Sequence, residues 1–170
     1  AKNARRKALT WGLDLQVVTD GSRQAAMYDL SKFVVFGASN SGRTNEVIAL
    51  MKKLQSGACA GRFGLTANED TLLHQNADQT FVLRCGWEQA VAATKSVAEQ
   101  ALFYQSIVSH VAGRTMDLSG LGQKVRQAMS LPIDQAVIDA AAKAAAIYFA
   151  GYNDGVAEEL TLKTNEITRK

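Results

Sequence analysis

Residues 33–54 read FVVFGASNSGRTNEVIALMKKL, and this stretch decides the predicted fold. A short apolar run ends at Gly37, and hydroxyl and amide side chains gather in the following residues 39–44, SNSGRT. Apolar residues then recur at the spacing of a helix with one apolar face, at Val47, Ile48, Leu50, Met51 and Leu54. The stretch therefore predicts a strand, a tight turn and a helix.

Residues 39–44, which we call the hydroxyl loop, have the composition of an anion-binding turn. The first N–H groups of a helix lack intrahelical partners and carry partial positive charge, and serine and threonine hydroxyls add further donors. No Gly-Lys-Ser/Thr closes the loop and its glycines lack the dinucleotide-binding spacing, so we expect a neutral cradle for a sugar phosphate. A plain turn whose Asn and Ser cap a helix is the alternative, and the pattern leaves both open.

Composition narrows the class of protein. The 170 residues, 47% hydrophobic and 21% charged, suit one globular domain with a real core. The net charge of +3 comes without a stripe of basic and aromatic residues, so no nucleic-acid partner is expected. The two cysteines and two histidines lack metal-ligand spacing, so we expect no metal and no cofactor. With no long apolar run or signal peptide, we expect a cytoplasmic protein that does not bind membranes.

Short apolar strands alternate with helices through the first two thirds of the chain. Strands are predicted at 13–19, 33–36, 61–66 and 80–83. Helices are predicted within 1–13 and at 21–28, 47–54, 71–75 and 88–110. This alternation predicts an α/β fold, a three-layer αβα sandwich with a parallel, Rossmann-like (flavodoxin-like) sheet that binds its ligand at the carboxyl ends of the strands.

The pattern changes near residue 115. Two helices are predicted at 119–129 and 134–144, followed by a buried strand at 145–151, AAIYFAG, and a helix at 156–170. We therefore expect a first domain over 1–115, a helical linker over 116–144, and the start of a second, truncated unit over 145–170.

Three segments together resemble the sugar isomerase (SIS) domain family, especially its two-domain phosphosugar isomerases and the isomerase half of glucosamine-6-phosphate synthase. The hydroxyl loop is similar to the family's Ser-Gln-Ser-Gly-Glu-Thr loop. Residues 88–95, EQAVAATK, are similar to its Glu-x-x-Val-Ala-Ser-Thr-Lys helix start, and residues 159–166, ELTLKTNE, to its Glu-x-x-x-Lys-x-x-Glu. The order and approximate separations of the three segments match those of the family.

The resemblance implies substrate-binding roles. The phosphate of a hexose 6-phosphate would be held by Ser39, Asn40, Ser41 and Thr44, and the sugar would meet backbone groups of Val91 and Ala92. Two positions depart from the family pattern: Ala93 stands where a serine is common, and Arg43 where a glutamate is common.

The resemblance makes Glu166 the general base that moves a proton between C1 and C2, with Lys163 beside it. Positions three apart share a helix face, so Lys163 would stabilise an enediolate or orient the carboxylate. A surface ion pair is the alternative reading of the same spacing. The implied activity is that of an aldose-ketose isomerase, or of a deaminase or aminotransferase-type isomerase. A non-catalytic phosphosugar sensor is the alternative.

The family's first strand has no counterpart in residues 1–170. We therefore expect the chain to be a piece of a longer or split two-domain protein, and a homo-oligomer such as a dimer to cover its apolar surface. Our hypothesis is that residues 145–170 supply a strand and helix beside strand 34–36, in the same chain or a partner's.

Overall fold

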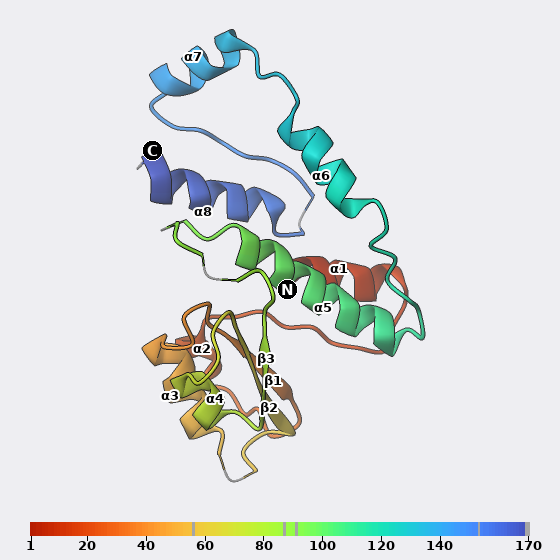
Figure 1. Cartoon of the computed structure of the whole chain (residues 1–170). Coiled ribbons are helices and arrows are strands. Elements are labelled where there is room, and N and C mark those ends of the chain that lie inside the picture. Colours follow the sequence, from red (N-terminus) through yellow and green to blue (C-terminus); the bar gives the residue numbers. More distant parts are fainter. Residues whose placement is uncertain (56, 87, 91, 153, 169–170) are drawn as a thin grey trace. The chain divides into compact units, whose positions relative to one another are not determined.

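The computed structural model describes all residues except 56, 87, 91, 153, 169 and 170 (Figure 1). The chain divides into two compact units. The first unit comprises Ala1 and Gln16–Tyr104, and the second comprises Lys2–Leu15 and Gln105–Lys170. Helix α5 (Lys95–Val111) contributes to both, since its residues from Gln105 onward belong to the second unit.

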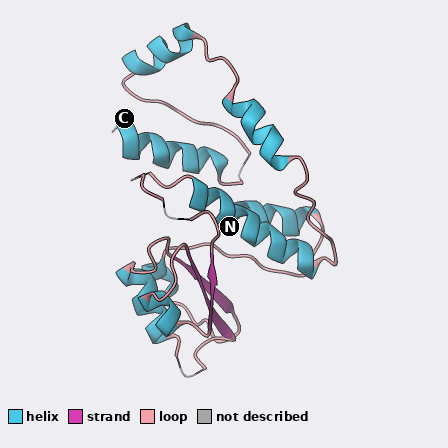
Figure 2. Cartoon of the chain, in the orientation of Figure 1, coloured by secondary structure: helices cyan, strands magenta, loops and turns pink. Residues whose placement is uncertain are grey.

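The first unit is built on a parallel three-stranded sheet (Figure 2). Its strands are β1 (Val34–Ala38), β2 (Gly61–Thr66) and β3 (Gln79–Val82), in the order β1-β2-β3. The strands contain mainly apolar and aromatic residues, which favour a pleated and partly buried surface. The expected parallel α/β sheet is confirmed.

One face of the sheet packs against α3 (Asn45–Lys53) and α4 (Leu72–Asn76). Figure 1 shows these helices, with α2 (Ser22–Ala25) beside α3, along one side of the strands. The core of this layer consists of Val47, Met51 and Leu73, against which Val35 packs. A Cβ at Gly37 would lie 2.4 Å from Met51 Cε and 2.9 Å from Val47 Cγ1, so a larger residue here would displace these core side chains.

Aromatic side chains connect the opposite face of the sheet to α5. The ring of Phe36 on β1 lies 5.2 Å from that of Phe63 and 6.2 Å from that of Phe103. Phe81 on β3 lies 5.0 Å from Phe103. Burial raises the pKa of the neighbouring Tyr104 to about 12. The sheet is therefore flanked by helices on both faces, as the three-layer prediction requires.

The second unit is helical among its described residues. It contains α1 (Lys2–Thr10), the end of α5, α6 (Leu121–Met129), α7 (Gln135–Lys143) and α8 (Val156–Thr168). Ion pairs join α1 to the start of α8, at 2.6 Å between Lys2 and Glu158 and at 3.2 Å between Arg6 and Asp154. No helix in the part of the chain that is described is long and apolar enough to cross a membrane.

Two predicted strands are wrong. Residues 13–19 and 145–151 form no strand, and β1, β2 and β3 make up the sheet of the residues described. The hypothesis that residues 145–170 place a strand beside 34–36 is therefore not met in this structure. A strand needs a hydrogen-bonded neighbour as well as β-branched and aromatic residues, and neither segment has one.

Candidate functional site

The hydroxyl loop connects β1 to α3 at the carboxyl end of the sheet. The Ser39 N–H donates to the Leu65 carbonyl at 2.9 Å, which fixes the start of the loop against β2. Gly42 has φ +65° and is buried, and a Cβ there would lie 2.4 Å from the Thr71 Cβ. Only glycine combines this backbone conformation with so close a neighbour. The loop is thus fixed at both of these points.

The hydroxyl groups of the loop converge from its two ends. Ser39 is buried, with 5% of its surface exposed, and its Oγ lies 2.7 Å from the Oγ1 of Thr44. The Thr44 N–H also donates to Ser39 Oγ at 3.3 Å. Ser41 is exposed, and its Oγ accepts from the Arg43 N–H at 3.2 Å. The structure therefore brings three of the predicted phosphate ligands onto one short turn.

Thr44 is the N-cap of α3 and makes no side-chain capping hydrogen bond. The backbone N–H of Glu46, in the first turn of the helix, donates to the carboxylate of the same residue. That bond and the Arg23 guanidinium, at 3.0 Å, hold the pKa of Glu46 below its usual range. The rest of the first turn offers the donors that an anion binds at a helix N-terminus.

Asn40 anchors the loop through its backbone and leaves part of its side chain unused. Its carbonyl accepts from Ala67 N at 3.0 Å, Thr66 Oγ1 at 3.1 Å and Asn68 Nδ2 at 2.9 Å. Its side-chain Oδ1 is buried without a hydrogen-bond partner among the residues that the structure describes. A buried amide oxygen of this kind is satisfied by a donor such as a sugar hydroxyl.

The second predicted segment, residues 88–95, is organised by the Glu88 carboxylate. Its oxygens accept from the backbone N–H groups of Thr94 (2.6 Å), Lys95 (2.7 Å) and Ser96 (3.3 Å). They also accept from the hydroxyls of Thr94 at 3.0 Å and Ser96 at 2.6 Å. The Ser96 hydroxyl and the backbone donors lower the pKa of Glu88 to about 2. Glu88 is thus a capping group for α5.

This cap corrects the predicted start of the long helix at residue 88, because α5 begins at Lys95. The Glu88 carboxylate closes the segment before α5 onto Thr94. Ala92 lies in this segment and is partly buried, while Val91 lies outside the described residues. The sequence analysis named Glu88 in this segment but did not predict that it caps the helix, because its nearest backbone partner lies six residues on, well beyond the usual capping box.

Glu99 fixes α5 to the end of β3. Its carboxylate accepts from the backbone N–H of Arg84 at 2.7 Å and of Cys85 at 2.6 Å. Desolvation, and then the Glu99 carboxylate, raise the pKa of the Cys85 thiol. The first turns of α5 therefore lie at the carboxyl end of β3. This is the edge of the sheet that carries the hydroxyl loop.

Lys163 and Glu166 lie together on α8, in the second unit. Lys163 Nζ is 2.9 Å from Glu166 Oε2 and 3.3 Å from Glu159 Oε1. Desolvation lowers the pKa of Lys163, but its hydrogen bonds to the two glutamates outweigh this, so the pKa is raised. Lys163 is therefore a cation that two carboxylates hold in its charged form.

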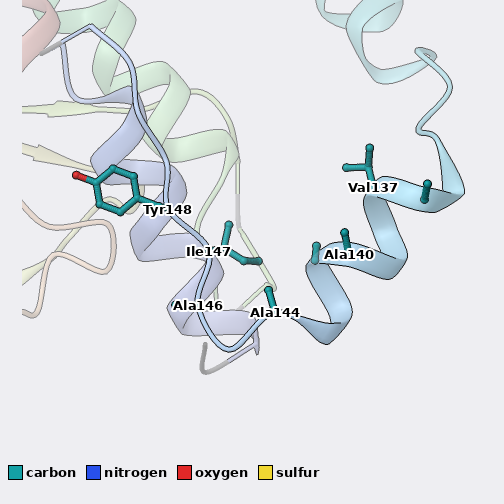
Figure 3. A pocket seen from close by; sticks show the side chains of 8 residues that line it. Val137, Ala140, Ala144, Ala146, Ile147 and Tyr148 are labelled. Carbon is teal, nitrogen blue, oxygen red and sulfur yellow. The ribbon is translucent and has the colours of Figure 1, made fainter.

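The described residues contain no group of three or more His, Cys, Asp or Glu side chains that could hold a metal ion. A shallow groove of about 530 Å³ lies in the second unit, between α7 and the segment after it (Figure 3). It is lined by Ala136, Val137, Ala140, Ala141, Ala144, Ala146, Ile147 and Tyr148. This apolar lining contains none of the predicted site residues.

Comparisons with known proteins support the fold. No family model matches the chain, and no curated protein matches it by sequence. Among solved structures, the C-terminal domain of glucosamine-fructose-6-phosphate aminotransferase from Francisella tularensis is similar, with a TM-score of 0.51 and 17% identity. The match covers 74% of this chain and 38% of that one, so the chain spans well under half of its structural neighbour. Over the matched region, the chain thus shares the α/β fold of that domain.

Proposed function

We propose that this chain is a sugar-phosphate-binding protein of the SIS type, with the phosphate held by the hydroxyl loop. The observation that carries the proposal is the turn itself. The hydroxyl of buried Ser39 is hydrogen-bonded to that of Thr44, and Gly42 has a left-handed backbone conformation. The turn leads directly into the N-terminus of α3. Phosphate oxygens are acceptors, and this turn presents hydroxyl and N–H donors.

The predicted binding residues divide the ligand between them. Ser39, Ser41 and Thr44 supply donors for the phosphate. The buried Oδ1 of Asn40 is a hydrogen-bond acceptor, and so is a phosphate oxygen. Asn40 Oδ1 therefore suits a sugar hydroxyl, which can donate to it. Ala92 and Val91 stay in the proposal as the backbone contacts to the sugar.

The finer proposal is an isomerase or amino-sugar deaminase acting on a hexose 6-phosphate. Glu166 would remove the proton next to the carbonyl carbon, and the Lys163 ammonium would stabilise the negative charge of the enediolate. The raised pKa of Lys163 supports this role, because the ammonium stays charged. The alternative is a phosphosugar sensor, in which Lys163, Glu159 and Glu166 form only a surface ion-pair cluster on α8.

Calorimetric titration tests the binding proposal. Fructose 6-phosphate, glucosamine 6-phosphate and inorganic phosphate are titrated into the wild type and into Ser41→Ala. Ser41 is exposed on the loop, so the variant should fold normally and lose most of the sugar-phosphate affinity. Ser106→Ala is the matched control, because Ser106 is an exposed serine outside the loop. Equal affinities for all three proteins would contradict the proposal.

A further inference from the structure

The N-terminus of α5 is already occupied by an anion that belongs to the chain. Three successive backbone N–H groups, those of Thr94, Lys95 and Ser96, all donate to the Glu88 carboxylate. The two nearby hydroxyls donate to it as well. An external phosphate at this helix start would need the same donors. The Glu88 carboxylate already accepts from all of them, so they are not available to a ligand.

The N-terminus of α3 differs in this respect. Its N-cap Thr44 makes no side-chain capping bond, and its Glu46 is paired with Arg23 rather than folded over the whole first turn. The structure therefore places a helix start with available donors after β1, and a helix start with a carboxylate on it near the end of β3.

The two helix starts lie at the same edge of the sheet. Glu99 binds the backbone directly after β3, and the hydroxyl loop directly follows β1. One strand, β2, separates β1 from β3. With strands spaced about 4.8 Å apart, the two strand ends are about 10 Å apart. A ligand that extends from the hydroxyl loop across β2 therefore runs toward the β3 side of the sheet, on which α5 begins.

We propose that Glu88 is a specificity-determining residue that restricts the site to sugars with a single phosphate. The inference rests on the proposed function, because it assumes that the first phosphate binds at the hydroxyl loop. A second phosphate that reached α5 would meet a carboxylate of the same charge and donors that are already used. Glu88 thereby favours a monophosphate whose other end is uncharged.

The test compares fructose 6-phosphate with fructose 1,6-bisphosphate by calorimetry at constant ionic strength. Wild type, Glu88→Gln and Glu99→Gln are titrated with each ligand. Glutamine removes the negative charge and one of the two acceptor oxygens, so Glu88→Gln releases donors at α5. We expect the ratio of bisphosphate to monophosphate affinity to rise about tenfold in this variant. Glu99→Gln removes a nearby charge that is not on the helix start, and we expect it to keep the wild-type ratio.

Three results would overturn the inference. An unchanged ratio in Glu88→Gln, with fructose 6-phosphate still bound by the wild type, would refute it and leave the proposed function intact. An equal rise in Glu99→Gln would show a general charge effect in place of a specific one. A wild type that binds neither ligand would refute the proposed function and this inference together.

A second variant keeps the inference testable if Glu88→Gln does not fold. Glu88→Ala removes the negative charge and both acceptor oxygens, and it places no glutamine NH₂ group against the backbone donors of Thr94, Lys95 and Ser96. It should raise the affinity ratio at least as much as Glu88→Gln. Circular dichroism confirms that the variants are folded, and a wild-type ratio in folded Glu88→Ala would contradict the proposal.

Discussion

Ser39 Oγ and Thr44 Oγ1 lie 2.7 Å apart, and this bond joins the first and last residues of the hydroxyl loop. Ser39 is buried, and its Oγ also accepts a hydrogen bond from the Thr44 N–H at 3.3 Å. The loop is therefore closed before any ligand binds. A preorganised turn of this kind loses less entropy when it binds an anion.

We expect Ser39→Ala to destabilise the protein by about 1 kcal/mol, because it removes the hydroxyl that two partly buried hydrogen bonds share. It should also reduce the free energy of sugar-phosphate binding by more than it reduces the free energy of unfolding. Urea unfolding gives the first quantity and calorimetric titration the second. Ser106→Ala, on the exposed surface of α5, should change neither. Full binding by Ser39→Ala would remove Ser39 from the site.

Gly42→Ala should be far more damaging than an alanine at another left-handed glycine. Its Cβ would lie 2.4 Å from buried Thr71, which caps α4, and we expect a loss of about 3 kcal/mol or more. Gly57 is the matched control in the same unit. It has φ +83° but nothing within 4 Å of a Cβ, so Gly57→Ala should cost only about 1 kcal/mol. Equal losses in thermal unfolding would contradict the close approach to Thr71.

The Glu88 cap predicts a specific loss of stability in acid. The pKa of Glu88 is about 2 in the folded chain, against an ordinary value of 4.5. A lowered folded-state pKa contributes stability above the ordinary value, and this contribution disappears as the pH falls from about 4.5 towards 2. The difference in unfolding free energy between wild type and Glu88→Gln should therefore be constant above about pH 5 and shrink below it. A difference independent of pH would show that the carboxylate is not capping α5.

The sequence predicted the parts of the fold that depend on local pattern. The strand at 61–66 matches β2 residue for residue, and the helix after the hydroxyl loop matches α3 closely. The predicted strands at 13–19 and 145–151 are wrong for a physical reason. An alternating or continuous apolar run shows that a segment suits a sheet, but a strand also needs an adjacent partner, which the local sequence does not reveal.

The candidate site was predictable only where its residues are adjacent in sequence. The hydroxyl loop is one continuous hexapeptide, so the sequence alone indicates that Ser39 and Thr44 belong to the same turn. Glu99 was not recognised, because its partners Arg84 and Cys85 lie on the preceding turn. A carboxylate in a helix that binds the backbone of a distant segment leaves no periodic signal in the sequence.

Substitution of Glu166 distinguishes an isomerase from a phosphosugar sensor. Glu166→Gln should keep sugar-phosphate affinity and lower turnover by about 10²- to 10⁴-fold, because glutamine cannot accept the substrate proton. Glu158→Gln is the matched control, since Glu158 is another glutamate of α8 and is paired with Lys2 at 2.6 Å. It should retain wild-type turnover. Proton exchange with solvent at C2 of the sugar, followed by NMR in deuterated water, measures the step directly. Exchange that persists in Glu166→Gln would exclude Glu166 as the base, and binding without exchange in the wild type would favour the sensor.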